Sequence, residues 1–477
     1  MRRRRQRRGA KPERLAEQPR TGAVLGALLG LLALSWAGCE SAPDGDPGAA
    51  AAGGGDGEAS REVGASLEGG GRPAGPDTTL RRLAETLLPE VEAMSGIRSV
   101  RPLALASSSR ETLEGFLARA LDEQLPPERA EAVGAVYARL GLLPDTLQLA
   151  PLFRSLLLEQ VVGYYDPARD TLYVVEGVSE LQLEPVLVHE MVHALQDQRT
   201  DLDSLTRSLA DANDRATAAQ AALEGHATFV MMEWLLSRQT GASVDLTAMP
   251  DLGGLLGGLD PSLLAGTPVL RDAPRVIRES LIFPYLGGLV FLQRIWSEDA
   301  LRPLPFGGAM PRSTEQVLHP ERFVPDPDEP VDVVFAAEPP APWGQVHSDG
   351  LGELEIRVFL EEHLGDETVA GTAAEGWDGD RYRLLRDGDG EVLIWVTVWD
   401  TARDAAQFAA AARQAFEARY ANGGGGRTVR VERGEVEGRQ VVTVLDVPRG
   451  VELGSVKPGA SGGGGLAEAL RFEIRGG

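Results

Sequence analysis

The spacing of apolar residues predicts helices along most of the first two thirds of the chain. Apolar positions there recur every three or four residues, which is the period of an amphipathic helix. This pattern predicts helices over residues 79–97, 109–124, 126–143, from about 184 to 198, 207–238 and 283–296. Residues 161–177 (VVGYYDPARDTLYVVEG) instead hold two β-rich runs around a proline-containing turn. That arrangement is typical of a β-hairpin.

The last third of the chain alternates between helical and strand patterns. An acidic, proline-rich stretch at residues 326–345 precedes it and is expected to be a linker. Beyond the linker the pattern predicts a helix at 351–364, a hairpin at 376–400, a helix at 404–420, and strands at 440–448 and 471–476. The expected fold class is α+β, with a mostly helical domain and a small sheet at 79–325, followed by a smaller α+β domain at 346–477.

The N-terminus has the pattern of an export signal. Nine of the first 20 residues are basic, and an apolar run at 22–38, short for a membrane span, ends in small residues before Cys39. This ending resembles the lipobox of bacterial lipoproteins, although Trp36 stands where that pattern has an aliphatic residue. We expect a signal peptide at 1–38, lipidation of Cys39 and a disordered tether at 39–78. An uncleaved signal anchor is the alternative. Both interpretations place the remaining chain outside the cytoplasm and tethered to a membrane.

Charge argues against a nucleic-acid-binding protein, and the cysteine content excludes a fold stabilised by intramolecular disulfides. Residues 39–477 carry 38 basic and 69 acidic side chains, a net charge of −31, whereas a nucleic-acid-binding protein needs a basic surface. Cys39 is the only cysteine, so no intramolecular disulfide can form. Stability must come from packing or from a bound metal.

The run VLVHEMVHALQDQ, residues 186–198, is apolar on nearly every side except at His189, Glu190 and His193. A helix of this kind is buried, and buried ionisable groups are costly unless they are paired or bind a metal. On a helix, residues four apart lie on one face, so both imidazoles can reach one ion while Glu190 takes a proton from water. Imidazole ligands and one open position favour zinc, which activates water for attack on a peptide carbonyl.

A third metal ligand is expected on the helix that contains ALEGHATFV, residues 222–230. Glu224 and His226 both qualify, but residues two apart on a helix point about 200° apart, so only one can face the metal. We favour Glu224. Asp197, one turn after His193, is either a hydrogen-bond partner of that histidine or a solvated charge near the helix end.

The HExxH motif followed by a glutamate in E-G-x-A resembles the gluzincins, the thermolysin-like superfamily of metallopeptidases. The resemblance covers about residues 150–325 and implies a zincin-like domain, with His189, His193 and Glu224 as zinc ligands and Glu190 as the general base. Thr228 departs from the family pattern, which has an aspartate at that position to orient a histidine. The motifs H-E-x-x-H-x-L-Q-D-Q and S-T-E-Q-x-L-H-P also resemble bacterial envelope proteins of unassigned role.

Hydrolysis of a peptide bond further needs a donor to the oxyanion of the transition state. His319 in STEQVLHP and Tyr285 in IFPYLGG are the candidates, and His319 is preferred. The sequence thus predicts a membrane-anchored zinc metallopeptidase of the bacterial envelope that acts on peptides or proteins. A catalytically inactive lipoprotein with the same fold, serving as a binding or structural module, is the alternative. A zinc hydrolase with another substrate is a third possibility.

Overall fold

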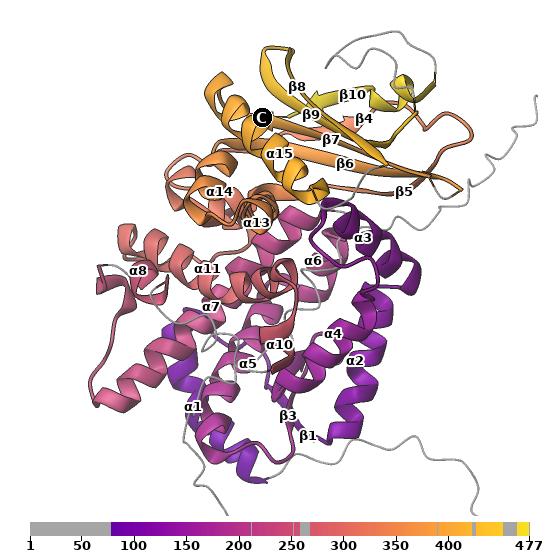
Figure 1. The fold of residues 1–477 in the computed structure, drawn as a ribbon. Coiled ribbons are helices and arrows are strands. Elements are labelled where there is room, and N and C mark those ends of the chain that lie inside the picture. Colours follow the sequence, from indigo (N-terminus) through magenta and orange to yellow (C-terminus); the bar gives the residue numbers. More distant parts are fainter. Residues whose placement is uncertain are drawn as a thin grey trace, which may run out of the picture.

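The computed structural model describes residues 78–210, 212–250, 252–257, 268–388, 390–421, 426–451 and 465–476. The expected signal peptide at 1–38 and residues 39–77 of the expected tether, with Cys39, lie outside the described residues, while Thr78 begins α1. The described chain is α+β, as the sequence predicts: its first part is mostly helical, and its last part is built on an antiparallel sheet (Figure 1). The helical part comprises α1 (Thr78–Ser95), α2 (Arg110–Gln124), α3 (Pro127–Leu140), α4 (Leu149–Gln160), α5 (Glu180–Thr200), α6 (Leu202–Ser208), α7 (Asn213–Thr240), α8 (Leu252–Gly257), α10 (Pro268–Asp272), α11 (Arg275–Glu298) and α12 (Thr314–Leu318).

A three-stranded sheet adjoins the helices. β2 (Gly163–Asp166) and β3 (Thr171–Val175) form the predicted hairpin, and β1 (Ala104–Ser108) pairs with β3 in parallel. Tyr164 stacks between the rings of Phe116 and Tyr173, with centroid distances of 4.4 and 4.9 Å, and so ties α2 to this sheet. Short 3-10 helices complete the connections, at Leu246–Ala248, Gly307–Ala309 and Pro320–Arg322, with one more near the C-terminus at Gly465–Leu470.

Helices α7 and α11 cross with their backbones in contact. A methyl group added at Gly288 would lie 2.0 Å from the carbonyl oxygen of Ala221, and one added at Gly225 would lie 2.3 Å from the carbonyl carbon of Gly288. Only glycine permits this approach. α11 is long and apolar enough to cross a membrane by length and composition, yet most of it is buried within the protein, as in the core helix of a soluble fold.

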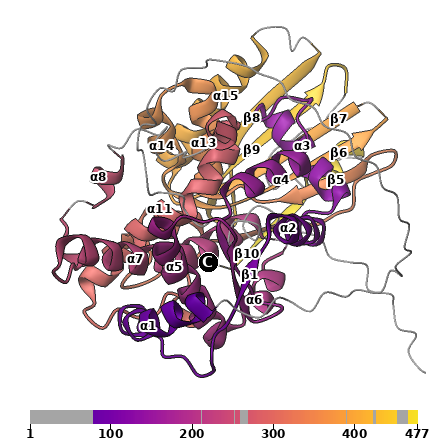
Figure 2. The same ribbon diagram turned by 90° about the horizontal axis from the view of Figure 1, so that it is seen from below.

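The C-terminal part, which we call the C-terminal module, has a five-stranded antiparallel sheet of order β5-β6-β7-β9-β8. Helices α13–α15 cover one face, and the pair β4–β10 packs on the other (Figures 1 and 2). Alternate residues of β7 accordingly enter different clusters, Trp395 and Trp399 with the helices and Val396 and Val398 with β4–β10. The elements are β4 (Asp332–Phe335), β5 (Gly344–Asp349), α13 (Gly352–Leu364), α14 (Glu367–Ala374), β6 (Trp377–Asp387), β7 (Gly390–Trp399), α15 (Ala402–Tyr420), β8 (Arg427–Val436), β9 (Arg439–Pro448) and β10 (Phe472–Arg475).

The structure differs from the sequence predictions where tertiary contacts decide the local conformation. The stretch expected to be one helix at 207–238 is broken before Asn213, whose backbone and side-chain amides bind the carboxylates of Asp349 and Glu355 in the C-terminal module. The expected linker at 326–345 contains β4, which pairs with the last strand. One hydrophobic core also runs from α2–α4 into α13–α15. The division into domains at 325 and 345 stays a prediction.

Two helices begin earlier than their patterns suggest. α5 starts at Glu180, so Pro185 lies inside the helix rather than at its first position. α11 starts at Arg275, directly after Pro274, and contains Pro284. α4, α14, β1, β5 and β8 belong to segments for which the pattern predicted no element. β1 and β5 pair with strands distant in the chain, whereas β8 forms a hairpin with β9 through a two-residue turn.

Candidate metal centre

The middle of α5 is enclosed by the rest of the fold. His189, Glu190 and His193 are 2%, 1% and 5% exposed, and the apolar residues around them are as deeply buried. α5 packs between the β2–β3 hairpin, α1 and α7. The sequence argument for a buried helix with ionisable groups is therefore confirmed, and these groups need partners.

Three side chains from two helices converge at one point. His189 Nε2 lies 3.2 Å from Glu224 Oε2, His193 Nε2 lies 3.3 Å from the same oxygen, and the two imidazole nitrogens are 3.0 Å apart. Glu224 comes from α7 and is 1% exposed. Among the described residues, His189, His193 and Glu224 form a group whose nitrogen and oxygen atoms could together hold a metal ion.

The spacing of the three atoms fits a divalent metal. Zinc–ligand distances of about 2.0–2.2 Å in a tetrahedron put neighbouring ligand atoms roughly 3.3–3.6 Å apart. The observed separations of 3.0–3.3 Å are within a few tenths of an ångström of that value. Two imidazoles and one carboxylate are also a donor set that suits zinc, and the fourth position remains for water or substrate.

A chain of hydrogen bonds fixes the proton on His193. Gln196 is fully buried, and its Nε2 donates to the carbonyl of Leu223 (3.0 Å) and to Nδ1 of His226 (3.1 Å). The amide orientation leaves Oε1 of Gln196 to accept from Nδ1–H of His193 at 2.9 Å. When His193 is neutral, its proton is therefore on Nδ1, and Nε2, which faces Glu224 and His189, has the lone pair that can bind a metal. Such an orienting partner is usual for a histidine that binds metal.

Electrostatics at the centre favour a cation. Burial lowers the pKa of His193, but the Glu224 carboxylate outweighs burial and raises that pKa to about 9. Burial raises the pKa of Glu224, yet His193 and His189 more than offset this and lower it to about 2. For His189, burial dominates and the pKa is lowered. Glu224 thus holds a positive charge at this point, and a metal ion would replace a proton there.

Glu190 is oriented by the hairpin in front of α5. The backbone N–H of Tyr165 in β2 donates to the Glu190 carboxylate, whose Oε2 has no partner among the described residues. Burial raises the pKa of Glu190 to about 8. A carboxylate with one anchored oxygen and one free oxygen, beside a candidate metal centre, can accept a proton from water.

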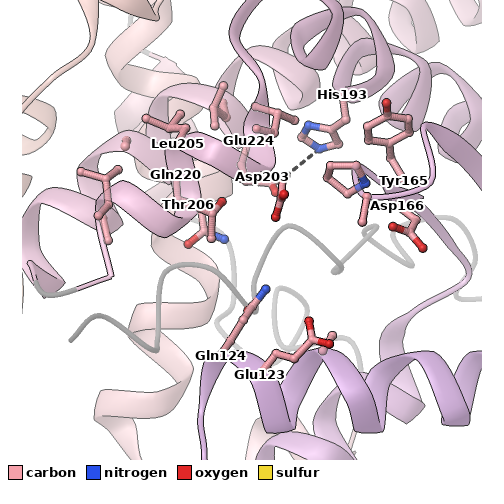
Figure 3. Close-up of a pocket in the computed structure, with 18 of the residues that line it drawn as sticks. Glu123, Gln124, Tyr165, Asp166, His193, Asp203, Leu205, Thr206, Gln220 and Glu224 are labelled. Atoms are coloured by element: carbon pink, nitrogen blue, oxygen red, sulfur yellow. Dashed lines mark ion pairs between the residues drawn. The ribbon is translucent and has the colours of Figure 1, made fainter. Parts of the chain in front are cut away.

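A cavity of about 530 Å³ opens onto His193 and Glu224. Its walls come from α2, the β2–β3 turn, α6 and α7, and Figure 3 shows the ion pair of His193 and Glu224 across the cavity from Glu123 and Gln124 of α2. This volume lies in the range of pockets that bind small molecules or a few residues of a peptide. The candidate centre is therefore buried but borders a space that a ligand can enter.

The structure distinguishes between the alternatives for the nearby residues. His226 uses Nδ1 for Gln196 and Nε2 for the carbonyl of Ser95, 3.1 Å away, so neither ring nitrogen is available to the centre. Asp197 does not contact His193; its Oδ2 lies 2.7 Å from the hydroxyl of Tyr165, and its Oδ1 accepts the N–H of Leu202 at the start of α6.

Of the two oxyanion candidates, the structure places only Tyr285 beside the centre. Its ring is inclined by 27° to that of His189, with a centroid distance of 6.1 Å. His319 instead faces the C-terminal module, where its Nε2 bonds Oε1 of Glu353 at 2.8 Å, and this bond raises the pKa of His319. Neither His319 nor Tyr285 lines the cavity, and His319 is not part of the triad. The position of STEQVLHP in the chain does not show that His319 contacts Glu353 of α13, so the sequence alone could not separate His319 from the centre.

Gln196, Gln220 and Gln124 are site residues that the sequence reasoning missed. Gln196 stands three residues after His193 in HALQDQ, so its helical spacing was a signal for a partner of that histidine. No local signal identifies the glutamines of α2 and α7, because the cavity that they line forms only on folding.

The similarity of this chain to known proteins is distant. Residues 339–454 match a family model described as a domain of unknown function, DUF8575, which covers β5 to β9 and not the triad. No curated protein matches the chain. One similar crystal structure is that of a candidate hydrolase with a novel fold from Chloroflexus aurantiacus, at 16% identity and a TM-score of 0.30, over 51% of this chain and 87% of that one.

Proposed function

We propose that this protein is a zinc metallopeptidase of the gluzincin type. The observation that carries the proposal is the convergence of His189, His193 and Glu224 within 3.0–3.3 Å of one another, with Glu190 beside them and a cavity in front. The resemblance of HExxH and E-G-x-A to gluzincins supports the same assignment. Zinc would supply Lewis-acid polarisation of a water molecule and of the substrate carbonyl.

The residues of this chain have distinct roles in the proposed reaction. His189, His193 and Glu224 hold the metal, and Gln196 keeps His193 in the tautomer that can bind it. Glu190 accepts the proton of the attacking water at Oε2 and passes it to the leaving amine, while the N–H of Tyr165 holds the other carboxylate oxygen. We assign Tyr285, rather than His319, as the side chain nearest the developing oxyanion because its ring packs against His189.

The metal content and activity of matched variants test this proposal. We expect about one zinc per chain by elemental analysis and cleavage of unfolded casein by the wild-type protein. Glu190→Gln should retain zinc and lose cleavage, because the amide cannot accept a proton. His193→Ala should lose both. Zinc without cleavage in the wild type would instead favour a non-catalytic binding module, and wild-type protein without zinc would refute the metal centre.

We also propose that Cys39 is lipidated and anchors the protein to a bacterial membrane from outside the cytoplasm. The support is sequence alone: the apolar run at 22–38 and the small residues before Cys39. The anchored chain would present its strongly acidic remainder to solvent, away from an anionic membrane surface. Labelling with a radioactive fatty acid should modify the wild type and leave Cys39→Ser unlabelled.

A further inference from the structure

The wall of the cavity beside Glu224 combines apolar side chains with polar and charged ones. Apolar side chains come from all four surrounding elements and include Phe116 of α2, Pro167 of the β2–β3 turn, Leu205 of α6 and Leu223 of α7. Among the polar side chains, Arg169 pairs with Asp166 near the turn. Two neutral amides also line the space, Gln220 from α7 and Gln124 from α2 (Figure 3).

Gln220 is a buried amide without a partner. The residue is 7% exposed, and within the described chain neither Oε1 nor Nε2 has a hydrogen-bond partner. A buried polar group left unpaired is destabilising, so native proteins seldom keep one without a use. Across the cavity, the buried Oε1 of Gln124 also lacks a partner among the described residues.

The position of Gln220 relates its amide to the candidate centre. Gln220 precedes Glu224 by one helical turn, so both side chains lie on the same face of α7 and both line the cavity. A group that meets Gln220 must both donate and accept a hydrogen bond, because its Oε1 accepts and its Nε2 donates. An amide meets this requirement, whereas an ester or a carboxylate offers acceptors only.

We propose that this cavity is a substrate subsite in which Gln220 binds an amide group of the peptide through a paired donor and acceptor, next to an apolar side chain. The inference rests on the proposed peptidase function. It adds the chemical class of ligand, an amide, that the cavity lined by α2, α6 and α7 would bind. The amide is either a main-chain peptide group or the side chain of asparagine or glutamine; the two sources share the same chemistry.

Binding of a small amide probe tests the subsite without any need for hydrolysis. Isovaleramide is titrated into ¹⁵N-glutamine-labelled protein, with methyl isovalerate as the matched ligand that keeps the apolar chain and the carbonyl but has no N–H donor. The side-chain resonances of Gln220, identified by their loss in Gln220→Leu, should shift with the amide and not with the ester. Gln239→Leu, the same substitution at an exposed position of α7, should leave probe binding unchanged.

Peptide kinetics distinguish the two sources of the amide. For Gln220→Leu we expect KM to rise about tenfold with kcat nearly unchanged and zinc retained, since one hydrogen bond to a buried group corresponds to about a factor of ten. An equal rise for every peptide indicates a main-chain amide, and a rise confined to peptides with asparagine or glutamine indicates a side chain. Gln124→Leu, at a half-buried position, should also weaken binding of the amide probe. This variant tests the subsite if Gln220→Leu does not fold.

The outcome that overturns this inference differs from failure of the peptidase. Gln220 resonances that stay unmoved at saturating probe, or that move equally with the ester, would refute the subsite even if the protein cleaves casein. Conversely, amide-specific shifts in a protein that binds zinc but cleaves nothing would retain the subsite and refute the catalytic assignment.

Discussion

The contact between α7 and α11 leads to a prediction whose sign can be worked out from the structure. Gly288→Ala would place a methyl carbon 2.0 Å from the carbonyl oxygen of Ala221, whereas ordinary contact begins at 3.4 Å. Both partners belong to helix backbones, so no side-chain rotation relieves the overlap. The helices must separate by about 1.4 Å along this line.

The magnitude follows from two opposing effects. Alanine in place of glycine inside a helix is favourable by about 1 kcal/mol. Overpacking costs about 1–3 kcal/mol, and a clash between two backbones belongs at the upper end of that range. We therefore expect Gly288→Ala to lower the free energy of unfolding by about 2 kcal/mol. Separation of the helices also moves Glu224, adjacent to Gly225 in this contact, relative to the histidines of α5.

Urea denaturation and metal content measure both effects. Gly115→Ala in α2 is the matched control, because its methyl group would meet only Arg119 Nη1, at 3.7 Å. It should raise the free energy of unfolding by up to about 1 kcal/mol, the opposite sign to Gly288→Ala. Zinc affinity should fall in Gly288→Ala and stay unchanged in Gly115→Ala. If Gly288→Ala matched or exceeded the stability of the wild type, the close helix approach would not constrain the fold.

Three further predictions concern the centre, the contact with the C-terminal module and the anchor. Gln196→Leu should weaken zinc binding by about 10- to 100-fold in chelator competition while Gln239→Leu does not, because His193 loses the partner of Nδ1; equal affinities would contradict this role. Burial raises the pKa of Glu355 from 4.5 to about 8, so the folded state keeps a proton that the unfolded chain loses as the pH rises through this range. Stability should fall by about 1.4 kcal/mol per pH unit for this group between pH 4.5 and 8. In urea titrations the free energy of unfolding of Glu355→Gln should therefore increase relative to that of the wild type as the pH rises. Parallel pH profiles of the two proteins would refute this. Cys39→Ser should move the protein from the membrane fraction to the soluble one, unless the segment at 22–38 remains as an uncleaved anchor.

The local pattern of the sequence was sufficient for the elements whose conformation depends on near neighbours. The β2–β3 hairpin, the N-cap of α2 at Ser109, and α13 and α15 all follow from apolar period and turn chemistry. The HExxH spacing also determined that His189 and His193 share one face of a buried helix, because four residues make about one helical turn.

Contacts between distant segments decided what the pattern could not. Glu224 rather than His226 faces the centre because Gln196 and Ser95 occupy both ring nitrogens of His226. His319 is held by Glu353, and the helix expected at 207–238 breaks where Asn213 meets Asp349 and Glu355. These hydrogen bonds join residues 30 to 142 positions apart in the chain.

The sequence by itself thus determined the α+β class and the residue types able to bind a metal, since both depend on periodicity and side-chain chemistry. Only the tertiary structure decided which of those residues meet and which glutamines face the cavity. Burial and hydrogen-bond pairing are properties of segments brought together by the fold, and no local stretch of sequence contains them.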